Sequence, residues 1–187
     1  MNIKERYEKL VSSTNNTSTI DEIKQLKIDC SKAMNYEYFY YCDLLLADLY
    51  TDNGNIDDAL AISLKDLNSI DSSVFRSIYV SFLDRIIYIY ISKKNFKTAY
   101  CYMNMKKDHL DLNNKQEVNR WYLESAYVYA ELNSISKALQ SLEAIVNNDA
   151  DDAMLSLVYS NMTKLYIDQE NVEKAKESLN LCLKYVY

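Results

Sequence analysis

The sequence contains no proline, one glycine and one histidine among its 187 residues. Glycine and proline make the tight turns of strand-rich folds, so their scarcity argues against a sheet with many hairpins. A single histidine leaves no pair of imidazoles for a metal or for acid–base catalysis. A single glycine cannot build a phosphate-binding loop. We therefore expect an all-α protein that is not an enzyme and has no cofactor and no metal site.

The sequence also lacks a basic surplus and a long apolar run. Its formal net charge is −6, which argues against binding to nucleic acid. The longest apolar stretch, residues 86–91, is too short to cross a membrane, and the charged N-terminus lacks a secretory apolar segment. The four cysteines are far apart, without a C-x-x-C pair, and we expect buried, reduced thiols. These features predict a soluble, cytoplasmic protein that does not bind membranes.

A five-residue motif recurs along the chain. It consists of a helix-capping residue, an apolar residue, two polar residues and a small or apolar anchor, and it occupies residues 19–23, 55–59, 95–99, 134–138 and 171–175. The successive anchors are 36, 40, 39 and 37 residues apart. Asn, Ser or Thr at the first position favours the start of a helix. A repeat of this length is typical of solenoids built from stacked helix pairs.

A second helical run precedes each of the last four motifs and ends in a tyrosine nine residues before the alanine anchor. The repeat unit is therefore predicted to be a pair of antiparallel helices joined by a short turn. We expect helices near residues 2–13, 19–34, 36–52, 56–69, 74–92, 96–109, 114–132, 135–147, 152–168 and 172–187.

The segment Leu46-Ala47-x-x-Tyr50, followed by residues 54–60 (GNIDDAL), resembles the tetratricopeptide repeat (TPR) family. The resemblance implies a right-handed α-α superhelix of about five antiparallel helix pairs, forming a single domain over residues 1–187. The chain departs from the family pattern because it lacks the proline after the second helix, and its repeats exceed 34 residues. Longer repeats without proline are similar to those of bacterial signalling and regulatory proteins.

The family register implies that the first helix of each pair lines a concave groove. It assigns to this groove Tyr41, Asp48, Asp84, Tyr88, Arg120, Tyr127, Ser160, Asn161 and Lys164. An aromatic and charged lining suits an extended peptide or a partner helix. The alternative is that these are ordinary solvated residues on a scaffold. The family's carboxylate clamp of Lys, Asn and Arg is replaced here by Leu44, Asp48, Arg85, Arg120 and Glu124, so that specificity is not carried over.

The leading hypothesis is a non-catalytic scaffold that binds a protein or peptide in its groove. The alternative is a sensor or regulatory module of a longer bacterial signalling protein, whose cyclase, kinase or transcription-regulator domain is absent here. The last helix keeps an apolar stripe of Leu179, Cys182, Leu183 and Val186. End repeats of a solenoid usually carry a polar outer face, so we expect either the N-terminal part of a longer protein or self-association through the C-terminal pair. We favour the longer protein.

Overall fold

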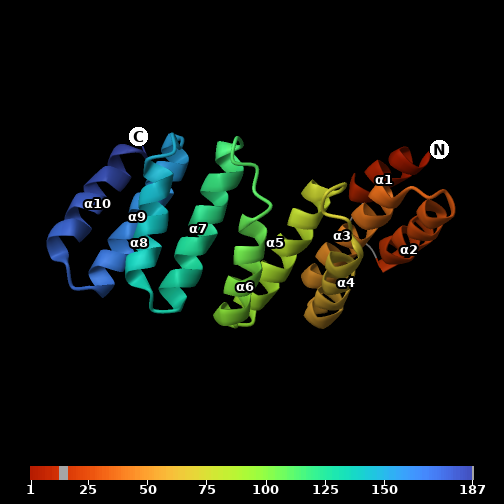
Figure 1. The fold of residues 1–187 in the computed structure, drawn as a ribbon, viewed down its shortest axis with the longest axis horizontal. Helices are drawn as coiled ribbons and strands as arrows, with labels where there is room; N and C mark the ends of the chain where they lie inside the picture. Colours follow the sequence, from red (N-terminus) through yellow and green to blue (C-terminus); the bar gives the residue numbers. More distant parts are fainter. Residues whose placement is uncertain (13–16, 187) are drawn as a thin grey trace. The chain divides into compact units, whose positions relative to one another are not determined.

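The computed structural model describes the backbone of residues 1–12 and 17–186 and the side chains of residues 1–12 and 19–186. These residues form ten α-helices and no strand, which confirms the all-α prediction. The helices are α1 (Ile3–Ser12), α2 (Thr17–Lys32), α3 (Tyr36–Asp52), α4 (Ile56–Ser69), α5 (Arg76–Ser92), α6 (Phe96–Lys107), α7 (Lys115–Glu131), α8 (Ile135–Val146), α9 (Asp152–Asp168) and α10 (Val172–Lys184) (Figure 1). The helix ends predicted at residues 13 and 187 lie outside the described residues.

The chain divides into two compact units, Met1–Lys93 and Lys94–Tyr187. In the first unit α2 packs on α3, α3 on α4 and α4 on α5, while α1 contacts both α2 and α3. In the second unit each helix from α6 to α10 packs on the next one along the chain. Within each unit, neighbouring helices therefore pack on one another, as the repeat predicted.

Asparagine and aspartate side chains cap the starts of several helices. The Oδ1 atom of Asn95 accepts a hydrogen bond from the Thr98 amide at 3.2 Å, and that of Asn171 accepts one from the Lys174 amide at 3.2 Å. Asn35, Asn114 and Asp151 cap α3, α7 and α9 in the same way. Asn55 and Ser134 occupy the N-cap positions of α4 and α8, although no side-chain cap bond forms there among the described residues.

The turns after α3 and α9 each contain one residue in the left-handed region of backbone conformation. Because these turns have the same geometry, the number of residues between the tyrosine and the next motif is constant. In the turn after α3, the amide of Asn55 donates to the carbonyl of Tyr50 at 2.7 Å, and Gly54 has a φ of 78°. After α9, the amide of Asn171 donates to the carbonyl of Tyr166 at 2.9 Å, and Glu170 has a φ of 58°. This pattern is the Schellman motif, in which each tyrosine carbonyl closes the turn.

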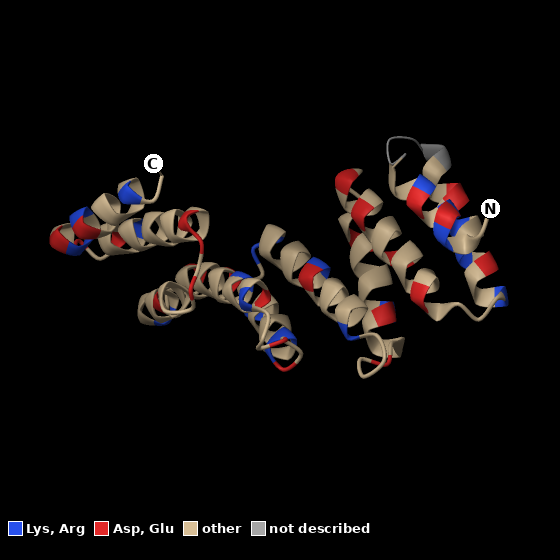
Figure 2. Cartoon of the chain, turned by 90° about the horizontal axis from the view of Figure 1, so that it is seen from above, with Lys and Arg blue, Asp and Glu red and all other residues tan. Residues whose placement is uncertain are grey.

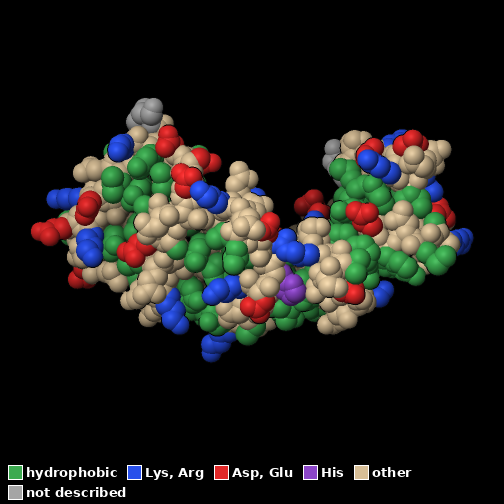
Figure 3. Space-filling view, turned by 45° about the horizontal axis from the view of Figure 1, so that its top comes forward, with side chains coloured by type: hydrophobic (Ala, Val, Ile, Leu, Met, Phe, Trp, Pro, Cys, Tyr) green, Lys and Arg blue, Asp and Glu red, His purple; other side chains and the backbone are tan. Residues whose placement is uncertain are grey.

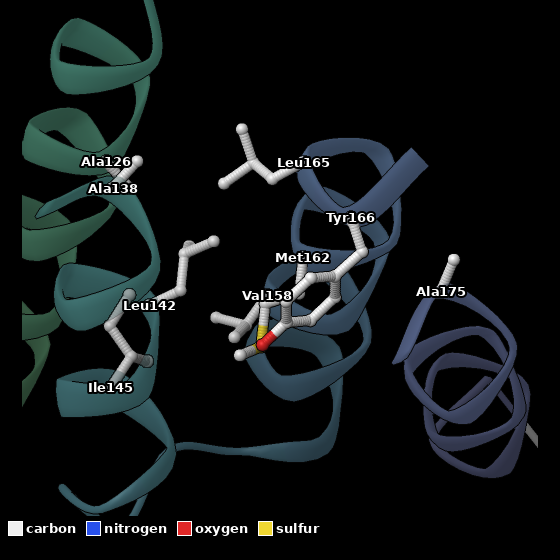
Figure 4. Packing of buried hydrophobic residues seen from close by; sticks show 9 residues of the cluster. All are labelled: Ala126, Ala138, Leu142, Ile145, Val158, Met162, Leu165, Tyr166 and Ala175. Atoms are coloured by element: carbon white, nitrogen blue, oxygen red, sulfur yellow. The ribbon is translucent and has the colours of Figure 1, made fainter. Parts of the chain in front are cut away.

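The anchor residues of the five motifs are buried between packed helices. Ile23, Ala59, Ala99 and Ala138 are fully buried and Ala175 is nearly so. In the second unit, Leu142 of α8 and Leu165 of α9 point toward one another beside Ala138 (Figure 4). Small anchors let paired helices approach closely, and the larger side chains fill the space between pairs.

Two sequence expectations were wrong in detail. Thr19 does not begin α2, which starts at Thr17; Thr19 is buried and continues the stripe of Ile23, Leu26 and Cys30 that faces the core. Cys101 is exposed rather than buried. It lies two residues after the Ala99 anchor, which places it on the opposite side of α6. Cys182 is only partly buried, whereas Cys30 and Cys42 are buried as predicted.

Basic and acidic residues are interspersed along the helices of each unit (Figure 2). Hydrophobic side chains also reach the surface (Figure 3). Leu112, Ile167 and Val172 are among the exposed apolar residues. Among the helices that the structure describes, none is both long enough and apolar enough to cross a membrane.

Candidate functional site

A cavity of 490 Å³ lies between α7, α8 and α9 in the second unit. Its residues on α7 and α9 are spaced mostly three or four apart, so each helix turns one face toward it. The cavity is lined by Leu123, Ala126, Tyr127, Ala130, Glu131, Asn133, Ile135, Leu142, Leu157, Asn161, Lys164, Leu165 and Asp168. Ala126, Leu142 and Leu165 also belong to the buried core, so the cavity reaches down to the core of this unit.

Tyr127 stands at the rim of this cavity. Its side chain is 47% exposed, so it is not a core residue. One side of the ring is supported by Phe96, whose ring centroid lies 6.2 Å away at an interplanar angle of 73°. This edge-to-face contact holds the aromatic ring in place while leaving much of it accessible to a ligand.

Asn161 and Lys164 reach the same cavity from α9. The Nδ2 atom of Asn161 donates to the carbonyl of Leu157 at 2.9 Å, which fixes the amide and leaves its oxygen as an acceptor. Lys164 is exposed and brings a positive charge. The structure thus brings three of the predicted groove residues together. Arg120 and Ser160 are exposed on α7 and α9, but neither is among the described residues that line the cavity.

Three other predicted residues meet in a hollow of 520 Å³ on the first unit, between α3 and α5. It is lined by Asp48, Thr51, Asp52, Asp84, Arg85 and Tyr88. Arg85 forms an ion pair with Asp48 at 2.5 Å and also donates to the carbonyl of Ser81 at 3.1 Å. Tyr88 is 60% exposed. The hollow therefore holds one arginine and three carboxylates, and the Arg85–Asp48 ion pair lies among them.

Tyr41 lies elsewhere, in an aromatic group with Tyr7 and Tyr38. Its ring centroid is 5.7 Å from each of the other two. Burial raises the pKa of Tyr41, and it raises the pKa of Tyr7 to about 12. Both phenols therefore stay protonated at neutral pH. This group packs α1 against α3, which gives Tyr41 a structural position rather than a place in the hollow.

A buried carboxyl pair, Asp43 and Asp66, lies in the core of the first unit. Each residue is 1% exposed, and Lys27 forms an ion pair with Asp43. Burial, reinforced by the neighbouring Asp43 carboxyl, raises the pKa of Asp66 to about 8. Neighbouring carboxyl groups also occur in sites of acid–base catalysis. Here no substrate could reach them, so we assign them a structural role.

A buried ion pair also stabilises the contact between α6 and α7. The Nζ atom of Lys106 lies 2.8 Å from Oε2 of Glu124, and Lys106 is almost fully buried. Beside it, Nε1 of Trp121 donates to the carbonyl of Met103 at 3.0 Å. Glu124, which occupies a clamp position of the family register, is therefore engaged in packing rather than directed to a ligand.

The sequence analysis did not identify the apolar side chains that line the cavity, nor its two carboxylates, those of Glu131 and Asp168. Leu123 precedes Tyr127 by one helical turn, and Leu157 precedes Asn161 in the same way. Glu131 follows Tyr127 by four residues, and Asp168 follows Lys164 by four. Extending each predicted position by one turn along the same helix face would have identified these four residues.

The described residues contain no group of three or more His, Cys, Asp or Glu side chains that could hold a metal ion. The Cys30 and Cys42 thiols lie near each other, and burial raises the pKa of Cys42 to about 12. A thiol that stays protonated is a poor nucleophile. Neither thiol is among the described residues that line the α7–α8–α9 cavity, which are mostly apolar with a few polar and charged side chains.

No family model and no curated protein matches the chain. Its fold is similar to the crystal structure of BtubC (BKLC) from P. vanneervenii, with a TM-score of 0.69 and 15% sequence identity. The similarity covers 99% of this chain and 91% of that one. At this identity the two proteins share a helical fold, and the comparison says nothing about a common ligand.

Proposed function

We propose that the chain is a non-catalytic scaffold of the TPR-like type that binds a peptide segment of a partner protein. The five repeated motifs, their buried anchors and the Schellman turns all support a helical repeat. In this proposal the pairs continue as a right-handed superhelix whose first helices, α3, α5, α7 and α9, line its inner face.

The cavity between α7, α8 and α9 is the observation that carries this proposal. It combines an apolar floor with a half-exposed aromatic ring and a few polar groups, which is the usual composition of a ligand site. Its volume of 490 Å³ lies within the roughly 300–1,000 Å³ that is typical of such sites. Tyrosine is enriched at binding surfaces because its large ring loses little conformational entropy.

Peptide display tests the proposal and requires no choice of partner protein in advance. A phage library of random 12-residue peptides is selected against residues 1–187, and the most enriched peptide is synthesised with a fluorescein label. Fluorescence anisotropy then gives its dissociation constant. We expect micromolar binding that weakens at least tenfold in Ala130→Phe, because a phenyl group in place of this half-buried methyl fills the cavity.

The matched control is Ala153→Phe, which places the same side chain on the exposed surface of α9, outside the cavity. It should leave the affinity unchanged. If Ala130→Phe loses its helical circular-dichroism signal, Leu157→Gln replaces it in the test. Leu157 lines the cavity but is 46% exposed, so its replacement should leave the fold intact. The proposal is wrong if no peptide is enriched, or if the enriched peptide binds all these variants as tightly as the wild type.

A further inference from the structure

The two ends of the α7–α8–α9 cavity differ in chemistry. Its floor and inner walls come from aliphatic side chains, among them Leu123, Ala126 and Leu142. The turn that follows α7 and the last turn of α9 supply its polar end, where Glu131 and Asp168 are the last residues of their helices. An apolar space therefore opens next to two carboxylates.

The backbone makes that end more negative. The carboxyl end of an α-helix carries roughly half a negative charge from its aligned peptide dipoles. α7 ends at Glu131 and α9 ends at Asp168, so each exposed carboxylate coincides with a negative helix terminus. Lys164, one turn before Asp168, supplies the cavity's one basic side chain among its described lining residues. The excess of negative charge favours a cationic group on the ligand.

The distance between the apolar floor and the two carboxylates restricts the spacing of the residues in a peptide that binds both. Ala126 on the floor precedes Glu131 by five residues, a rise of about 7.5 Å along α7. Leu165 precedes Asp168 by three residues, or about 4.5 Å along α9. An extended peptide advances about 3.3 Å per residue. A side chain on the floor and a charge at the acidic end therefore lie about one to three residues apart in a bound peptide.

We infer that this cavity recognises a peptide with a bulky aliphatic or aromatic residue and a lysine or arginine one to three residues away. The apolar side chain enters the cavity beside Tyr127, and the cationic group lies against Glu131 and Asp168. This inference rests on the proposed function and specifies its ligand. An acidic peptide is disfavoured because Lys164 alone would have to offset both carboxylates.

A charge exchange tests the inference directly. The labelled peptide from the display selection is compared with a version in which its basic residue is replaced by Glu. Wild-type protein should bind the original peptide at least tenfold more tightly. The double variant Glu131→Lys/Asp168→Lys should reverse this preference. The control variant Glu143→Lys/Glu177→Lys changes the net charge equally at exposed sites outside the cavity, and it should keep the wild-type preference.

The outcomes separate the two proposals. If peptides bind through the cavity but lack the apolar and basic pair, the inference is overturned while the proposed function stands. The same holds if the double variant and the control change peptide preference equally, because the effect is then one of net charge. If no peptide is enriched, the proposed function is overturned and this inference with it.

Discussion

The ring of Tyr127 meets the ring of Phe96 edge to face, with centroids 6.2 Å apart and planes inclined at 73°. Phe96 opens α6, and Tyr127 lies on α7 at the rim of the cavity. This contact links the packing of two neighbouring helices to the position of an accessible aromatic side chain. A ring that is already held in place loses little entropy when a ligand binds.

Tyr127→Ala should therefore weaken peptide binding by about 1–2 kcal/mol while leaving the fold largely intact. Binding is measured by anisotropy with the display-selected peptide, and folding by urea denaturation. Tyr36→Ala, which removes an exposed tyrosine from the start of α3, is the matched control and should bind normally. Equal affinities of the two variants would show that Tyr127 is no anchor.

The Asp43–Asp66 pair predicts an unusual pH dependence of stability. Burial, with the neighbouring Asp43, raises the pKa of Asp66 to about 8 in the folded chain, against about 3.9 when unfolded. The folded state therefore retains a proton that the unfolded state releases. The stabilisation from this group is complete below pH about 4 and is lost as the pH rises to about 8.

Urea denaturation at pH 5, 6, 7 and 8 checks this prediction. The wild-type free energy of unfolding should fall as pH rises, and Asp66→Asn should flatten that fall and be the more stable protein at pH 8. Asp108→Asn, at an exposed carboxyl, should keep the wild-type slope. If Asp66→Asn keeps that slope as well, Asp66 does not titrate as proposed.

The Schellman turns predict that some non-glycine residues are strained. Glu170 has a φ of 58°, in the left-handed region that costs a residue with a Cβ roughly 1 kcal/mol. Glu170→Gly should therefore raise the free energy of unfolding by about 0.5–1 kcal/mol. Gly54 has a φ of 78°, and a Cβ there would meet nothing within 4 Å. Gly54→Ala should thus be destabilising by a similar amount through backbone strain alone. Destabilisation by Glu170→Gly would contradict this interpretation of the turn.

An exposed apolar stripe on α10 predicts self-association of residues 1–187. Leu179 and Leu183 on α10 and Val186 just after its end are each about half exposed, and exposed apolar patches are found at protein interfaces. We expect concentration-dependent dimers in sedimentation equilibrium, weakened by Leu179→Gln/Leu183→Gln. The control, Leu112→Gln, alters an exposed leucine outside α10. If the chain is a monomer at all concentrations, the prediction of self-association through α10 is wrong.

The sequence predicted the helices well because capping residues and apolar spacing are local signals. The anchors Ala59 and Ala138 are buried because the period of the repeat places them between paired helices. The site was only partly predictable. The position of Tyr127 on α7 was enough to predict that it faces the cavity. The position of Tyr41 could not be predicted in this way, because it depends on a contact with Tyr7 on a different helix. The burial of Asp66 likewise depends on α3 and the Lys27–Asp43 pair, which no local pattern encodes.

Chemical-shift mapping tests the central claim most directly. The ¹⁵N-labelled chain is titrated with the display-selected peptide, and the backbone amide shifts are followed by NMR. The proposed site predicts that the largest shifts lie in α7 and α9, around Tyr127, Asn161 and Lys164, and that Ala130→Phe abolishes them. Shifts that cluster in α1–α4 or along α10, with α7 and α9 unchanged, would contradict it.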